Sequence, residues 1–202
     1  MPFTKNQIDL ICYGREERHL EYKGSLEFSN DASKALVARA IAAHSNARDG
    51  GDIIVGMEKC GESYSPSGVT PAHLATFKSD ELRDYIQVHF LPMPNFKMDI
   101  DEFEGKSFII ISVSPFGLYP CVCVQGYCEK GASRPTLTKG IIYVRSKRKP
   151  ESAPLETEED LAELIDTSAD RWLQYRARRD KTSSLVSPED SRKGFESEGS
   201  DL

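Results

Sequence analysis

Residues 42–57 read Ala-Ala-His-Ser-Asn-Ala-Arg-Asp-Gly-Gly-Asp-Ile-Ile-Val-Gly-Met, and this stretch decides the fold. Its first residues close an amphipathic helix that we expect to begin near residue 32. Gly50 and Gly51 can adopt positive φ, so they predict a tight turn after that helix. The apolar run at residues 53–55 is typical of a buried strand. The stretch therefore predicts a helix, a glycine turn and a core strand in direct succession.

The rest of the chain mixes helices and strands without a regular strand–helix–strand repeat, which favours an α+β fold over a doubly wound one. Helices are expected at residues 5–12, 32–46, 79–90 and from residue 157 onward, and strands at residues 20–23, 52–57, 96–101, 107–113, 121–124 and 141–145. Residues 58–68 are expected to form a polar loop, and residues 104–106 the turn of a β-hairpin. We therefore expect a mixed or antiparallel sheet with flanking helices.

Length and composition fit a single domain. The chain has 202 residues, of which 39% are hydrophobic and 29% charged, so it can bury a core of ordinary size. We expect residues 1–15 to form an N-terminal helical lead-in and residues 16–180 to form the domain with its C-terminal helix. Residues 181–202 are rich in Ser, Glu, Asp and Lys and poor in large apolar residues, so we expect a disordered tail.

The sequence predicts a cytoplasmic protein. No apolar run approaches the roughly 20 residues that cross a bilayer, and residues 1–11 lack the basic and apolar regions of a secretory signal. Five cysteines without regular spacing are expected to remain thiols in a reducing compartment. Cys121, Cys123 and Cys128 lack the paired spacing of a zinc site. Packing of Cys121 and Cys123 on one face of a short strand is favoured, and a metal site completed by Cys60 or a distant His is the alternative.

Four segments, taken in order, match the pattern of one family. They are Glu16-x4-Glu21-Tyr22-Lys23, the stretch 42–57 quoted above, residues 108–114 with Pro120, and Ile142-Tyr143-Val144-Arg145-Ser146. Together they resemble the Schlafen AlbA-like domain, which is also catalogued as a divergent AAA or DNA-binding family. The resemblance extends from residue 16 to about residue 164. It implies a compact module that binds nucleic acid.

The densest group of cations follows the last of these segments. Within five residues the chain carries Arg145, Lys147, Arg148 and Lys149. Cations at this density attract phosphates and release counterions, and the family pattern places Lys23 and Arg48 near the same surface. Our leading hypothesis is a module that binds the backbone of DNA or RNA without a cofactor, with a homodimer as a way to double the contact area. A solvated turn is the alternative. The net charge of −6 argues mildly against a non-specific DNA coat but leaves room for a local basic face.

The resemblance also implies an enzymatic alternative. In animal relatives, a similar core resembles a metal-dependent endoribonuclease whose metal site is built from two glutamates and an aspartate. The glutamates correspond to Glu16 and Glu21, whereas the aspartate position falls at Lys59, beside Glu58. Glu16, Glu21 and Glu58 would then be both the catalytic residues and the ligands of Mg²⁺ or Mn²⁺. Pairing of the two glutamates with Lys23 or Arg18 is the favoured interpretation, so binding without catalysis is preferred.

Two further possibilities concern other parts of the chain. A protein-interaction adaptor would use the last helix, where Trp172 and Tyr175 lie, together with the charged tail.

Gly105-Lys106-Ser107 resembles the end of a phosphate-binding loop, but Ile100 stands where the first glycine of that motif is required. We therefore reject an ATP site and interpret the segment as a hairpin turn.

Overall fold

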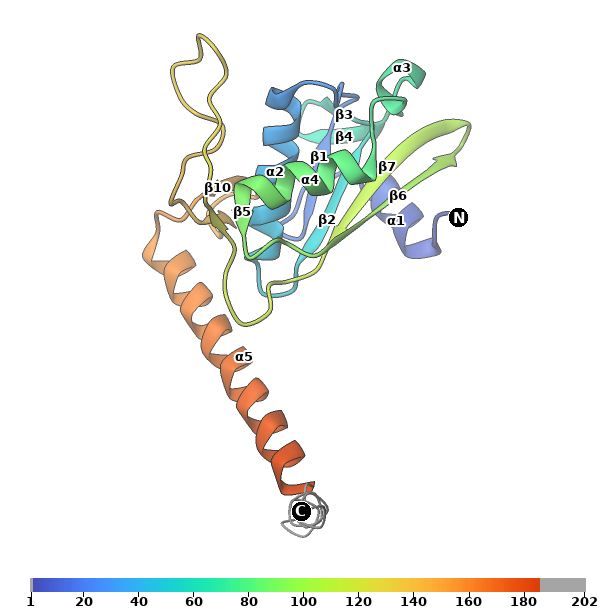
Figure 1. Ribbon diagram of the computed structural model, residues 1–202. Coiled ribbons are helices and arrows are strands. Elements are labelled where there is room, and N and C mark those ends of the chain that lie inside the picture. Colours follow the sequence, from blue (N-terminus) through green and yellow to red (C-terminus); the bar gives the residue numbers. More distant parts are fainter. Residues whose placement is uncertain (1, 186–202) are drawn as a thin grey trace, which may run out of the picture.

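A mixed four-stranded sheet lies at the centre of the protein (Figure 1). The computed structural model describes the backbone of residues 2–185 and the side chains of residues 2–180. The sheet has the strand order β1 (Leu20–Lys23), β2 (Gly51–Val55), β7 (Lys106–Val113), β6 (Phe96–Phe103). β1 and β2 are parallel, and the other two pairs are antiparallel. The predicted α+β class and the predicted mixed sheet are therefore confirmed.

Helices flank the sheet, and three short strand pairs extend the structure around it. The helices are α1 (Lys5–Tyr13), α2 (Asp31–Ser45), α3 (Pro71–Leu74), α4 (Ser79–His89) and α5 (Glu158–Leu185). The antiparallel pairs are β3 (Met57–Cys60) with β4 (Ser63–Pro66), β5 (Phe90–Leu91) with β8 (Val122–Cys123), and β9 (Tyr143–Arg145) with β10 (Ser152–Pro154). No helix within residues 2–185 is long and apolar enough to cross a membrane.

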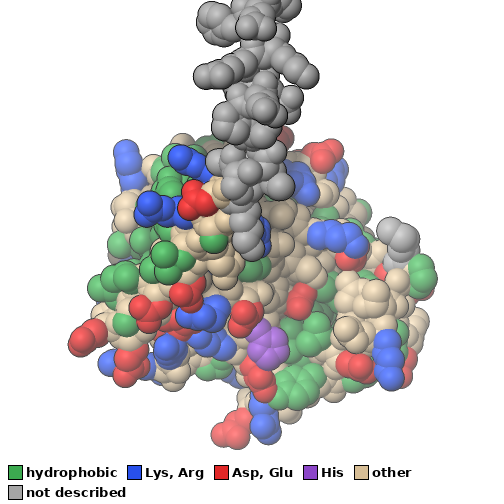
Figure 2. Space-filling view, turned by 90° about the horizontal axis from the view of Figure 1, so that it is seen from below, with side chains coloured by type: hydrophobic (Ala, Val, Ile, Leu, Met, Phe, Trp, Pro, Cys, Tyr) green, Lys and Arg blue, Asp and Glu red, His purple; other side chains and the backbone are tan. Residues whose placement is uncertain are grey.

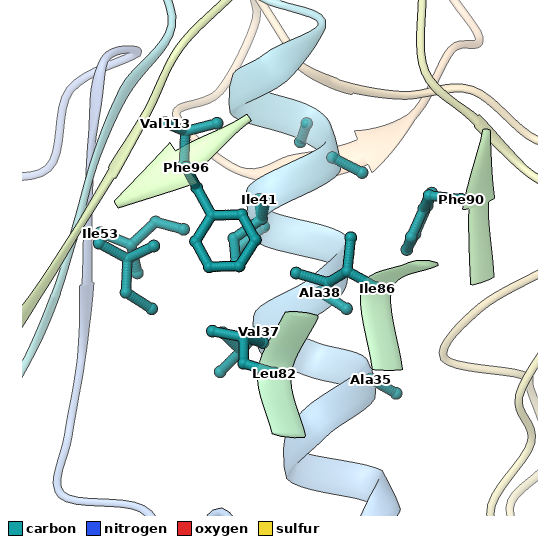
Figure 3. Close-up of a cluster of buried hydrophobic side chains, with 14 of the residues drawn as sticks. Ala35, Val37, Ala38, Ile41, Ile53, Leu82, Ile86, Phe90, Phe96 and Val113 are labelled. Atoms are coloured by element: carbon teal, nitrogen blue, oxygen red, sulfur yellow. The ribbon is translucent and has the colours of Figure 1, made fainter. Parts of the chain in front are cut away.

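Alternation along the strands divides the core into two clusters. Ile53 and Val55 of β2 pack in the larger cluster with residues of α2 and α4, whereas Ile54 packs with Ile11 of α1 in the smaller one. Successive side chains of a strand point to opposite faces of its sheet, which places these helices on the two faces. Figure 3 shows part of the larger cluster, with Ile53 beside residues of α2 and α4.

The turn between α2 and β2 is fixed by its two glycines. Gly50 has φ +77°, and a Cβ there would lie 2.2 Å from the carbonyl oxygen of Val113. A Cβ on Gly51 would lie 2.3 Å from Cδ2 of His44 and 2.4 Å from the carbonyl oxygen of His19. Contacts this short are impossible for a real side chain, so the backbone passes where only glycine fits. The predicted tight turn is confirmed, and the lack of room for a side chain explains why both positions are glycine.

Asn46, which follows α2, connects that helix to two segments that are distant in sequence. Its Nδ2 donates to the carbonyl oxygens of Cys121 (2.8 Å) and Tyr143 (2.9 Å), and its Oδ1 accepts from the backbone N–H of Cys121 (2.7 Å). The side chain is buried, so these bonds satisfy backbone groups that water does not reach. Asn46 thereby holds β9 and the segment before β8 against the end of α2.

The structure corrects some local predictions and confirms others. Residues 58–68 do not form an open loop, because residues 57–66 pair as the β3–β4 hairpin. Residues 104–106 are a hairpin turn as predicted, between β6 and β7. Cys121 and Cys123 are buried, which confirms their packing role, and all five cysteines are unbridged. The helix expected to end near residue 180 continues to Leu185, and the rest of the expected disordered tail lies outside the described residues.

Replacing Asn46 tests whether this side chain holds the fold together. Asn46→Ala leaves one N–H and two carbonyl groups without their partners, so we expect the free energy of unfolding to fall by about 2 kcal/mol or more. Urea denaturation followed by circular dichroism measures the change. Asn6→Ala, at an exposed position of α1, is the control and should change stability little. Equal effects of the two substitutions would contradict the role assigned to Asn46.

Candidate functional site

Arg145 of β9 lies at the centre of a buried ionic network. The side chain is completely buried, and its Nη1 donates to Oε2 of Glu21 at 2.7 Å. Nη2 donates to the carbonyl oxygen of Glu17 at 2.8 Å, and Nε to that of Arg18 at 3.1 Å. The guanidinium group therefore joins β9 to the segment that leads into β1. Arg145 was predicted to belong to an exposed phosphate-binding surface, and this placement is corrected because its donors are used inside the protein.

Glu21 of β1 is the acidic partner in the network. Its Oε1 accepts from Nζ of Lys23 at 2.7 Å, and its Oε2 also accepts from the hydroxyl of Ser152 at 2.7 Å. Burial raises the pKa of this carboxyl group, but the charges of Lys23 and Arg145 outweigh burial and lower the pKa to about 2. Glu21 is thus a structural carboxylate that is ionised at neutral pH. The favoured interpretation, pairing with Lys23, is confirmed for Glu21. It is wrong for Glu16, whose partners are Tyr22 and Tyr64.

His44 lies beside this network without taking part in its hydrogen bonds. The imidazole is completely buried, Nδ1 donates to the carbonyl oxygen of Ala40 at 2.9 Å, and Nε2 has no protein partner. Burial, and after it the nearby charge of Arg145, lower the pKa of His44 to about 4, although the charge of Glu21 opposes them. The ring is therefore neutral at physiological pH.

The three carboxylates of the predicted nuclease do not meet. Oε1 of Glu16 accepts from the backbone N–H of Tyr22 at 2.9 Å, and its Oε2 accepts from the hydroxyl of Tyr64 at 3.0 Å. Glu58 is exposed on the β3–β4 hairpin. Among residues 2–180, whose side chains are described, no three His, Cys, Asp or Glu residues lie close enough together to hold a metal ion. The arrangement predicted for metal-dependent cleavage is therefore not formed by Glu16, Glu21 and Glu58 in this structure.

Exposed cations gather where the β1 lead-in, the turn after α2 and the turn after β9 approach one another. One surface hollow is lined by Arg18, His19, Arg48 and Glu163, with Ala47, Asp49 and Gly50. An adjoining hollow is lined by Arg18, Arg48, Lys147 and Glu163, with Glu159, Ala162 and Asp166. Segments separated by about a hundred residues thus place Arg18, Arg48 and Lys147 around shared hollows. We call this region the basic junction.

Acidic residues of α5 pair with the cations of the basic junction. Glu163 lies 2.8 Å from Nη2 of Arg18 and 3.0 Å from Nζ of Lys147, and Asp170 lies 3.5 Å from Nη1 of Arg48. On the face seen from below in Figure 2, Lys and Arg side chains are interspersed with Asp and Glu. The junction therefore has mixed charge, and its cations already have carboxylate neighbours.

The six residues predicted to contact nucleic acid fall into two groups. Arg48, Lys147, Arg148 and Lys149 are exposed, whereas Lys23 is mostly buried against Glu21 and Arg145 is fully buried. Arg18 lines both hollows but was not among the predicted contact residues. It lies in a stretch where acidic and basic residues alternate, and only the fold reveals that it faces Lys147 across Glu163.

The turn after β9 is anchored at both ends. Arg145 pairs with Ser152 of β10 in the strand ladder, and Asp160 of α5 accepts from the hydroxyl of Ser146 (3.1 Å) and from the backbone N–H of Lys147 (3.0 Å). Thr157 also accepts from the backbone N–H of Asp160 at 3.1 Å and thereby caps the first turn of α5. The exposed cations of residues 147–149 are therefore presented on a turn whose position is fixed by the core.

Comparisons with known proteins found one matching family model and similar solved structures. A family model described as "Schlafen, AlbA_2" matches residues 16–154. Among solved structures, the DIP2311 protein from Corynebacterium diphtheriae has a TM-score of 0.53 at 16% identity, over 81% of this chain and 28% of that one. The N-terminal domain of a RecG-related protein from Nitrosomonas europaea, named after an ATP-dependent DNA helicase, has a TM-score of 0.37 at 17% identity, over 57% of this chain and 74% of that one. No curated protein sequence matches.

The pKa of His44 predicts how stability depends on pH. The folded state holds the pKa at about 4 and the unfolded state near 6.5, so the unfolded chain takes up a proton first as the pH falls. Stability should therefore decrease between pH 6.5 and pH 4, by up to about 3 kcal/mol. Glu21, with a folded pKa of about 2 against 4.5, adds a further loss below pH 4.5.

Urea unfolding at a series of pH values from 7 downward measures this dependence. His44→Asn, whose amide can replace the Nδ1 donor but does not titrate, should flatten the curve between pH 6.5 and pH 4. His19→Asn is the matched control for the substitution itself, because the His19 side chain is 58% exposed and its replacement should change stability at pH 7 little. If the His44 variant and the unaltered protein lose stability in parallel, the neutral buried imidazole is not the cause.

Proposed function

Because the chain belongs to the Schlafen AlbA_2 family, we propose that it binds nucleic acid by contacting the phosphate backbone with the turn after β9 and the adjoining basic junction. The contact residues in this proposal are Lys147, Arg148 and Lys149 of the turn, with Arg48 and Arg18 beside them. The observation that supports this proposal is that bonds to the rest of the domain fix the position of the turn. Arg145, Ser146 and the backbone of Lys147 are all bonded to the domain, while the three cations face solvent.

An anchored turn suits phosphate recognition for a physical reason. Ordering a flexible loop on binding costs conformational entropy, and a turn that is already fixed avoids most of that cost. Lys and Arg side chains still retain their own freedom to follow a phosphate chain. Contacts of this kind position a nucleic acid without reading its bases, and their affinity falls steeply with salt. We therefore propose binding with little sequence preference.

The acidic residues of α5 set the strength of this interaction. A phosphate that approaches Lys147 or Arg18 must compete with Glu163, and one that approaches Arg48 must compete with Asp170. The Arg48–Asp170 pair is exposed, and pairs of this kind contribute only about 0–1 kcal/mol, so a phosphate can displace it. Glu163 is only 11% exposed, so it competes more strongly for Arg18 and Lys147. Together with the net charge of −6, they predict moderate rather than tight binding.

Cleavage is not part of this proposal. The side-chain oxygens of Glu16 and Glu21 accept hydrogen bonds from groups of the domain itself, and Glu21 is neutralised by two cations. Recruiting either carboxylate to a metal ion would break these contacts and leave the buried charge of Arg145 without its partner, which is costly. The observations favour a binding module over a nuclease.

Reversing charges on the anchored turn tests the proposal. Lys147→Glu with Arg148→Glu should weaken binding of a labelled RNA hairpin, single-stranded DNA or duplex DNA by about tenfold or more, and should reduce the slope of log K against log salt by about 1 for each lost phosphate contact. Fluorescence anisotropy at several salt concentrations measures both quantities. Gel analysis of the same nucleic acids with EDTA, Mg²⁺ or Mn²⁺ reports cleavage.

A matched control uses the same two residue types elsewhere. Lys130→Glu with Arg134→Glu changes the net charge equally, on an exposed loop between β8 and β9 (yellow in Figure 1). This control should bind nearly as the unaltered protein does. Equal weakening by both pairs would mean that only total charge matters, and the proposed surface would be wrong. Metal-dependent cleavage that is lost in Glu58→Gln, at an exposed position, would favour the nuclease instead.

A further inference from the structure

Helix α5 extends well beyond the part of the chain that the family model matches. It spans Glu158–Leu185, whereas the match ends at residue 154. Its 28 residues correspond to a length of roughly 42 Å. Leu164 and Thr167 are buried against the domain, and Arg171 donates to the carbonyl oxygens of Phe116 and Arg48. Figure 1 shows the C-terminal part of α5 projecting away from the domain.

A second side of α5 carries large apolar residues that are exposed. Leu161 is 45%, Ile165 58%, Trp172 37% and Tyr175 43% exposed. With Ser168 between them, they recur at alternating intervals of four and three residues, so they form one stripe along the helix. Most exposed apolar residues occur singly, whereas a continuous stripe on a projecting helix indicates a surface for another helix.

The charges of α5 are segregated along its length. Residues 158–170 include six acidic residues and no Lys or Arg, whereas residues 171–180 include four Arg and one acidic residue. Two parallel copies of this helix would place like charges side by side. Two antiparallel copies would place the acidic half of each against the basic half of the other, which is favourable. Because Asp160, Glu163 and Asp170 already bond within the same copy, this complementarity depends on Glu158, Glu159 and Asp166.

The apolar stripe fits the same orientation. With a twofold axis between Ser168 and Ala169, Ile165 lies opposite Trp172 of the second copy, and Leu161 lies opposite Arg176, one residue beyond Tyr175. Small side chains at the axis allow the two backbones to approach there. The hydroxyl of Ser168 already donates to the carbonyl oxygen of Leu164 at 2.8 Å, so it can be covered without losing a hydrogen bond.

From these observations we propose that two copies of this chain associate through α5, as an antiparallel helix pair centred on residues 168 and 169. The pairing covers the stripe formed by Leu161, Ile165, Trp172 and Tyr175. It also supplies tertiary contacts to the projecting half of the helix, which is only marginally stable in water alone. The contact is isologous, so it closes after two copies. It does not depend on nucleic-acid binding.

Light scattering coupled to gel filtration tests the proposal on the full chain. The unaltered protein should have twice the monomer mass of 22.6 kDa at high concentration. Ile165→Glu should yield the monomer mass with an unchanged circular dichroism spectrum, because this side chain is exposed in the single copy. Val88→Glu, at an exposed apolar position of α4, is the control and should remain dimeric. A monomeric unaltered protein, or a dimeric Ile165→Glu variant, would overturn the proposal.

Charge exchange tests the orientation. Glu158 lies opposite Arg179 of the second copy in the antiparallel pair, so Glu158→Arg and Arg179→Glu should each weaken the dimer at low salt. An equimolar mixture of the two variants should recover a dimer of mixed composition. In a parallel pair Glu158 would face Glu158, and neither substitution would weaken association. Unchanged dimers of both single variants would therefore rule out the antiparallel arrangement.

Discussion

The buried contact between Glu21 and Arg145 is the interaction on which the arrangement of the other parts depends. It joins β1 of the central sheet to β9, which belongs to another strand pair. Nη1 of Arg145 lies 2.7 Å from Oε2 of Glu21. Taking two charges out of water is unfavourable unless every donor and acceptor finds a partner. Here Lys23 and Ser152 complete the coordination of the carboxylate, and backbone carbonyls of the β1 lead-in complete that of the guanidinium.

The positions of the exposed groups follow from this buried contact. Because Arg145 is fixed, the next residues emerge at a defined place, where Asp160 of α5 holds Ser146 and the backbone of Lys147. The same guanidinium bonds the carbonyl of Arg18, whose own side chain reaches Glu163. The cations of the basic junction thus lie outside the buried Glu21–Arg145 pair and are positioned by it. Most acidic members of the basic junction come from α5, the helix that we propose to pair with a second copy.

Much of the fold could be predicted from local sequence, but the site could not. The helix, glycine turn and strand of residues 42–57 were evident from periodicity and from the special conformations of glycine. The β3–β4 hairpin was missed because its strands are short and polar. Arg145 was taken for a surface residue because three exposed cations follow it within four positions. Its burial depends on Glu21, 124 residues away, and no local pattern encodes such a pairing.

A double-mutant cycle on the Glu21–Arg145 contact tests the account most directly. Glu21→Gln, Arg145→Gln and the combined variant would be unfolded with urea at neutral pH, and the coupling free energy calculated from the three changes. Each single substitution leaves a buried charge without its main partner and should cost about 3–5 kcal/mol. The account predicts that the double variant loses at least about 2 kcal/mol less than the sum of the single losses. Losses that add to within about 0.5 kcal/mol would show that the two side chains act independently and would contradict it.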